Sequence, residues 1–131
     1  MATEKNKILV FGNVLLKNDS IPLRLVPKLR ESFPKIEFKE FDPNDDLEKE
    51  GKTLNIIDSV EGIKKVVLIN EIDSLQTQRV FSMHDFDLAH SLKLLKKTGY
   101  VDSVNIFGVP MEISEEEALI QIKALIKATL S

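Results

Sequence analysis

Two continuous apolar runs constrain the fold of this chain more than any other feature of its sequence. Residues 8–11 and residues 66–69 consist only of aliphatic and aromatic side chains. A strand with one face in water alternates apolar and polar residues, whereas a strand covered on both faces can be apolar throughout. We therefore expect two buried strands of a parallel sheet, with the second run at its centre.

Helical spacing and capping residues predict four helices between the strands. A Ser-x-x-Glu capping box at Ser114 opens the last helix, and another helix covers residues 84–97, with lysines in its final turn and a glycine after it. The first helix starts near Pro22, but Pro27 should kink it or delay its start. A short helix is expected at residues 53–60.

Further strands are expected at residues 36–41 and 104–107, so that strands and helices alternate along the chain. This alternation predicts an α/β fold: a three-layer sandwich with a mostly parallel twisted sheet and helices on both faces. A length of 131 residues suits a single domain that spans residues 1–131.

Composition excludes several classes of function. The chain has no cysteine, so thiolate nucleophiles, disulfides and cysteine-bound metals are absent, and a metal must bind through oxygen and nitrogen. Basic and acidic residues are interspersed, with a net charge of −3, which argues against a nucleic-acid partner. No apolar run is long enough for a membrane span or a secretory signal, so we expect a cytoplasmic protein without membrane insertion, and a monomer.

Three polar residues follow expected strand ends or open expected helices: Asp19, Asn70 and His84. Ligands bind outside the carboxyl ends of parallel strands, so we expect all three at one edge of the sheet. A carboxylate, an amide oxygen and a neutral imidazole can together bind a borderline divalent metal. The same residues also suit a helix cap, a turn and a first helical turn without any function, and both interpretations stay open.

Three motifs resemble those of one known family. Residues 12–19 read Gly-Asn-Val-Leu-Leu-Lys-Asn-Asp, residues 82–88 read Ser-Met-His-Asp-Phe-Asp-Leu, and residues 107–114 read Phe-Gly-Val-Pro-Met-Glu-Ile-Ser. In this order they are similar to motifs of the endopeptidases that mature nickel–iron hydrogenases. The resemblance covers nearly the whole chain and identifies it as a divergent member of that family.

The resemblance implies roles for individual residues. Asp19 and His84 would be catalytic, and Asp19, Asn70 and His84 would contact a metal. Asn70 stands where the family has a second acidic ligand, and its amide oxygen is a neutral, weaker ligand. The implied cofactor is nickel carried by the substrate, with no organic cofactor. The implied reaction removes the C-terminal extension of a hydrogenase large-subunit precursor after nickel insertion, so the chain would be a metal-dependent endopeptidase.

Two other functions compete with this interpretation. A non-catalytic relative could bind a hydrogenase subunit or a metal-bearing peptide as an assembly factor, and Asn70 is the feature that favours it. A phosphoacceptor signalling domain shares the α/β architecture, but it needs an aspartate after residues 66–69 and an acidic pair after residues 8–11. Asn70 and Gly12-Asn13 occupy those places and argue against it.

The ligand set predicts that nickel or cadmium binds between Asp19 and His84, with a weak contact from Asn70. His84→Ala should weaken the binding of free nickel in calorimetry because it removes the imidazole ligand. Asn70→Asp should tighten binding about tenfold, which requires a net gain of only about 1.4 kcal/mol from the added charge. Unchanged affinity in Asn70→Asp would show that this side chain does not face the metal.

Overall fold

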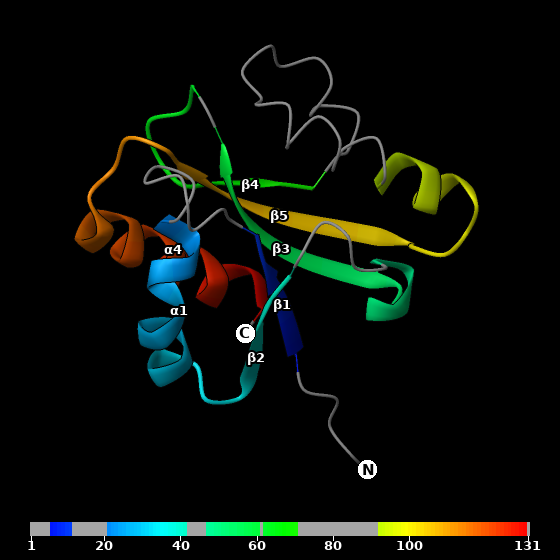
Figure 1. The fold of residues 1–131 in the computed structure, drawn as a ribbon, viewed down its shortest axis with the longest axis horizontal. Helices are drawn as coiled ribbons and strands as arrows, with labels where there is room; N and C mark the ends of the chain where they lie inside the picture. Colours follow the sequence, from blue (N-terminus) through cyan, green and yellow to red (C-terminus); the bar gives the residue numbers. More distant parts are fainter. Residues whose placement is uncertain (1–5, 12–20, 42–46, 61, 71–91, 131) are drawn as a thin grey trace.

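A five-stranded sheet forms the centre of the molecule (Figure 1). The computed structural model describes residues 6–11, 21–41, 47–60, 62–70 and 92–130. The strands follow the order β2-β1-β3-β5-β4 across the sheet. Their bounds are β1 Asn6–Val10, β2 Ile36–Glu40, β3 Thr53–Val60, β4 Val67–Ile69 and β5 Ser103–Pro110.

Four of these strands are parallel, and the longest pairing joins β3 to β5. β1 pairs in parallel with β2 and with β3, and β3 pairs in parallel with β5 from Thr53↔Ser103 to Val60↔Pro110. The fold class expected from the sequence, a mostly parallel α/β sheet with helices, is therefore confirmed.

The helix expected at residues 53–60 is wrong, because this segment is β3, the central strand. Every residue of β3 after Thr53 is buried, including Asn55, Asp58 and Ser59. A strand covered on both faces shows no period of two, and here its apolar residues happened to match helical spacing. The β-branched side chains of Thr53, Ile56, Ile57 and Val60 favour the strand.

The position expected for the second apolar run is also wrong. β4 lies at the edge of the sheet and runs antiparallel to β5, with Val67 opposite Gly108 and Ile69 opposite Ile106. Only residues 61–66 connect β3 to β4, whereas a parallel crossover takes a dozen or more residues. The chain therefore leaves β3 at the carboxyl ends of the parallel strands and returns in the opposite direction as β4, alongside β5.

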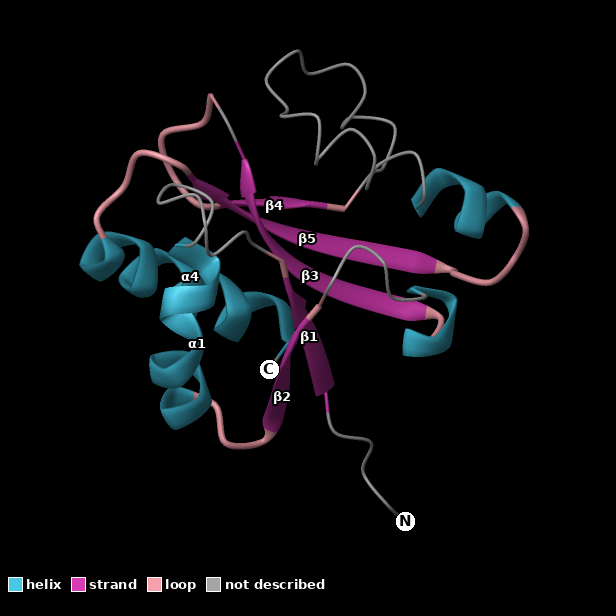
Figure 2. Cartoon of the chain, viewed as in Figure 1, coloured by secondary structure: helices cyan, strands magenta, loops and turns pink. Residues whose placement is uncertain are grey.

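Helices cover both faces of the sheet (Figure 2). Helix α1 (Ile21–Ser32) and helix α4 (Glu115–Leu130) pack on one face, where they bury side chains from β1, β3 and β5. The 3₁₀ helix η1 (Leu47–Glu50) and the helical residues 92–97 contribute Leu47, Leu92 and Leu95 to the cluster on the other face. Among the described helices, none combines the length and the apolarity that a bilayer span requires.

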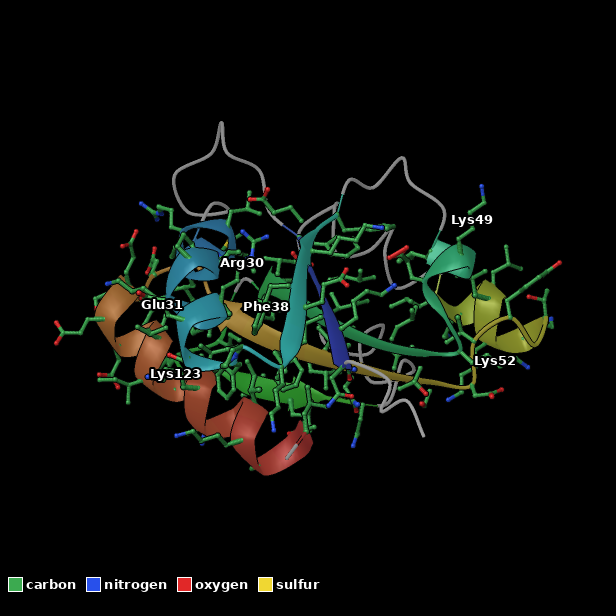
Figure 3. The ribbon with its side chains drawn as sticks, turned by 90° about the horizontal axis from the view of Figure 1, so that it is seen from below. Arg30, Glu31, Phe38, Lys49, Lys52 and Lys123 are labelled. Atoms are coloured by element: carbon green, nitrogen blue, oxygen red, sulfur yellow. The ribbon has the colours of Figure 1, made fainter. Side chains whose placement is uncertain are left out.

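Pro27 does not delay the start of α1. The helix begins at Ile21 and contains Pro27, which lies on its exposed side. There, water can bond to the carbonyl that the missing N–H leaves without a helical partner. Arg30 on the same helix donates to the Phe38 carbonyl of β2 at 2.8 Å and ties α1 to the sheet (Figure 3).

Two expected helix ends are confirmed. The Ser114 Oγ accepts the Glu117 N–H at 3.1 Å, as a helix cap does, and α4 starts directly after it. At the end of residues 92–97, Gly99 has a φ of 87°, and the Tyr100 N–H donates to the Leu95 carbonyl. This is a Schellman ending, which needs the left-handed backbone that glycine adopts without strain.

Glu50 connects η1 to two strands through ion pairs. Its side chain is 7% exposed, and its carboxylate lies 3.1 Å from the Lys7 Nζ and 3.0 Å from the Lys39 Nζ. Burial raises the pKa of Glu50, but hydrogen bonds and Coulomb attraction from both lysines outweigh it and hold the pKa below the ordinary 4.5. The ionised form of Glu50 is therefore favoured by folding.

Glu50→Gln should lower the free energy of unfolding at pH 7 by roughly 1 kcal/mol or more, because both lysines lose a charged partner. A carboxyl whose folded pKa is lowered stabilises the protein above its unfolded pKa, and this contribution disappears as pH falls through the folded pKa. The difference between the variant and the parent should therefore shrink below pH 4.5. Urea unfolding at pH 7 and pH 3 measures this difference in the free energy of unfolding. An equal difference at both pH values would contradict the ion-pair explanation.

Candidate functional site

The described residues place one buried carboxylate near the carboxyl end of the central strand. Asp58 on β3 is 3% exposed, and its Oδ1 accepts the Ser59 N–H at 2.9 Å. An aspartate is almost never fully buried unless its charge is paired or bonded. At a position where parallel α/β sheets bind ligands, a buried carboxylate is a candidate functional group.

The neighbouring position on β5 carries no side chain. Gly108 is the register partner of Asp58 and also of Val67 on β4. A Cβ placed on Gly108 would come within 2.9 Å of the Val60 Cγ2, with Val67 and Ile63 also near. Apolar groups thus fill the space over Gly108, beside Asp58, and lower the local dielectric constant in which the carboxylate acts.

β1 ends beside the same point of β3. The Phe11 N–H donates to the Ile57 carbonyl at 2.8 Å, so the chain leaves β1 next to Asp58. The following residues lead to α1, whose first residue, Ile21, is buried. Asp19 falls within that connection and lies outside the described residues, as does His84.

Asn70 does not share this edge of the sheet. It follows β4 directly and is exposed, and β4 runs against β5 with Ile69 opposite Ile106. The carboxyl end of β4 therefore points toward the amino ends of β3 and β5. The expectation that Asn70 lies at the carboxyl edge of the parallel strands is wrong, because it assumed that residues 66–69 were parallel. The tenfold gain in nickel affinity expected for Asn70→Asp rested on the same assumption and is no longer expected.

Sequence reasoning missed Asp58 because its segment was interpreted as a helix. The signal was present in Asn55-Ile56-Ile57-Asp58-Ser59, where an apolar pair ends in a carboxylate and a small residue. Within the described ranges, no group of three or more histidine, aspartate or glutamate side chains is arranged to hold a metal. Asp58 is the buried carboxylate that the described residues place at this edge.

Asn55 is a second buried polar group on β3, and its bonds are structural. Its Oδ1 accepts from the Asn105 Nδ2 at 3.0 Å, and its Nδ2 donates to the Lys7 carbonyl at 3.4 Å. These contacts tie β3 to β5 and β1 in the amino-terminal half of the sheet. They lie away from the edge where Asp58 is found, and we assign them no part in the site.

The fold and this carboxylate define a mostly parallel α/β protein with a buried carboxylate near the carboxyl end of its central strand. No protein-family profile and no curated protein sequence matches the chain. Solved structures do match it. The hydrogenase maturating endopeptidase HybD from E. coli is 21% identical with a TM-score of 0.65, and the alignment covers 95% of this chain and 94% of HybD.

Two further solved structures have the same fold. The endopeptidase HycI from Escherichia coli is 18% identical with a TM-score of 0.63, over 94% of this chain and 90% of HycI. An uncharacterized protein from Wolinella succinogenes is 17% identical with a TM-score of 0.60, over 95% of this chain and 99% of that protein. The chain thus has the fold of the hydrogenase maturating endopeptidases, which confirms the fold that the sequence motifs imply.

Gly108→Ala should lower the free energy of unfolding by about 1–3 kcal/mol, because its Cβ would meet the Val60 Cγ2 at 2.9 Å. Val60→Ala removes that methyl group, so the double variant should lose less stability than the two single variants added together. Urea unfolding of the four proteins measures the coupling. Simple additivity would show that Val60 does not set the space beside Asp58.

Proposed function

We propose that this chain is a divergent hydrogenase maturation endopeptidase that removes the C-terminal extension of a hydrogenase large-subunit precursor after nickel insertion. Its fold, shared with two endopeptidases over nearly the whole chain, supports the hydrolase class. The motifs around Asp19 and His84 support the family. The observation that carries the proposal is the buried carboxylate of Asp58 near the carboxyl end of β3.

We assign the three metal-contacting positions to Asp19, Asp58 and His84, with Asp58 in the place that the sequence motifs gave to Asn70. Two carboxylates and an imidazole suit a borderline divalent ion such as nickel. They also restore the charge that a neutral amide at the third position would lack. Asp19 and His84 keep the catalytic roles implied by the family resemblance.

The groups around the proposed metal-contacting residues have separate roles. The Ser59 N–H bonded to the Asp58 Oδ1 fixes the orientation of the carboxylate. The apolar cover over Gly108 keeps water from the flank of Asp58, so its attraction to a cation is less screened. His84 binds as the neutral imidazole. Nickel belongs to the substrate, where a divalent ion can polarise a scissile carbonyl or activate water.

A non-catalytic assembly factor is the alternative function. The feature that favoured it was the neutral Asn70 in the ligand set, and an exposed Asn70 beyond an antiparallel edge strand no longer supplies that argument. Such a factor would bind the precursor and leave its C-terminus intact. The single-domain organisation, the monomeric state and the cytoplasmic location stay predictions.

A nickel-loaded large-subunit precursor should lose its C-terminal extension when incubated with this chain, as intact-mass spectrometry would show. Asp58→Asn should lower kcat/KM about 100-fold, because removing one partner of a buried charge contact costs roughly 2–5 kcal/mol. His84→Ala and Asp19→Asn should also stop processing. Asn70→Ala is the matched control and should process the precursor at the parental rate.

Thermal unfolding of each variant separates lost activity from lost folding. Asp58→Asn retains the shape of the side chain, so we expect this variant to fold. Precursor that binds the parent chain in a pull-down but keeps its full mass would support the assembly factor instead. Full activity in Asp58→Asn together with loss in Asn70→Ala would return the third ligand position to Asn70.

A further inference from the structure

An apolar cavity lies at the opposite end of the sheet from Asp58. It opens between the C-terminal ends of α1 and α4, beside the turn into β2 and the first residue of β1, and has a volume of about 380 Å³. In Figure 1 the last turns of α4 lie close to β1 and β2, near the C-terminal mark. Its lining consists of Asn6, Ser32, Phe33, Pro34, Lys35, Ile36, Ile126, Lys127 and Leu130.

The walls and the rim of this cavity differ in chemistry. Phe33, Ile36, Ile126 and Leu130 supply apolar surface from β2, from α4 and from the turn between α1 and β2. Among the lining residues that the structure describes, Lys35 and Lys127 are the charged ones, and both are exposed. The described part of the cavity therefore combines an apolar interior with two lysines at its rim.

From this combination we propose that the cavity binds a small carboxylate with an unbranched apolar tail. The tail replaces water against the apolar walls, and the carboxylate meets the ammonium group of Lys35 at the rim. The volume lies at the lower end of the range of ligand pockets, roughly 300–1,000 Å³, which suits a short alkyl chain. A cationic ligand fits less well because the lysines would repel it. A dicarboxylic ligand fits less well because its second carboxylate would be desolvated against the apolar walls without a partner.

This site is separate from the one that contains Asp58. Asn6 and Val10 are the two ends of β1, four residue steps or roughly 13 Å apart along the strand. The cavity lies at the Asn6 end, and β1 reaches Asp58 only beyond Val10, through the Phe11 N–H bonded to the Ile57 carbonyl. Binding at the cavity thus does not depend on the proposed protease activity.

Calorimetric titration of the full chain with hexanoate, octanoate and decanoate, below the concentrations at which they form micelles, tests the proposal. Each added methylene should tighten binding about fourfold, as expected for burial of one more apolar group. Octanol has the same tail without the charge and should bind at least tenfold more weakly than octanoate. Equal affinity for octanol and octanoate would overturn the role of Lys35 and with it the proposal.

Variants locate the binding to the cavity. Lys35→Gln should weaken octanoate several-fold without changing octanol, whereas Lys28→Gln, an exposed lysine of α1 outside the lining, should change neither. Ser32→Trp should fill the opening and abolish both. Equal effects of Lys35→Gln and Lys28→Gln, or binding that appears only after residues 1–5 are removed, would contradict the proposal. The second result would assign the cavity to the N-terminus of the chain itself.

Discussion

Burial of β3 on both faces is the constraint on which the rest of this structure depends. Ile56 and Ile57 point to opposite sides of the sheet and belong to different apolar clusters. Neither side chain is exposed to solvent. Both clusters therefore form only when β3 occupies the middle of the sheet, between β1 and β5. The same position takes Asp58 out of water, so the core and the candidate site have one origin.

Much of the fold could be predicted from local patterns. The strands at Asn6–Val10, Ile36–Glu40 and Ser103–Pro110, the helix α4 and the glycine ending at Gly99 all follow from apolar runs, capping residues and the handedness of the backbone. These signals reside in a few consecutive residues, which is why a sequence reveals them without tertiary information.

The features that could not be predicted depend on contacts distant in sequence. β3 combines apolar and polar residues without a clear period, because its surroundings on both faces decide its conformation. The direction of β4 depends on its connection to β3, since six residues are too few for a parallel crossover past β5. Composition does not encode this constraint. Asn70 was accordingly assigned to the wrong edge of the sheet, and Asp58 was hidden in an expected helix.

The small size of β4 gives the sheet an uneven resistance to local opening. β4 is a three-residue edge strand whose strand partner among the described residues is β5, whereas β3 and β5 pair along eight residues at the centre. Separation of β4 withdraws Val67, Leu68 and Ile69 from the two apolar clusters but leaves the central pairing intact, so it costs less than global unfolding. Val67 of β4 packs near Gly108, the neighbour of Asp58. A short edge strand thus supplies part of the apolar cover beside the buried carboxylate.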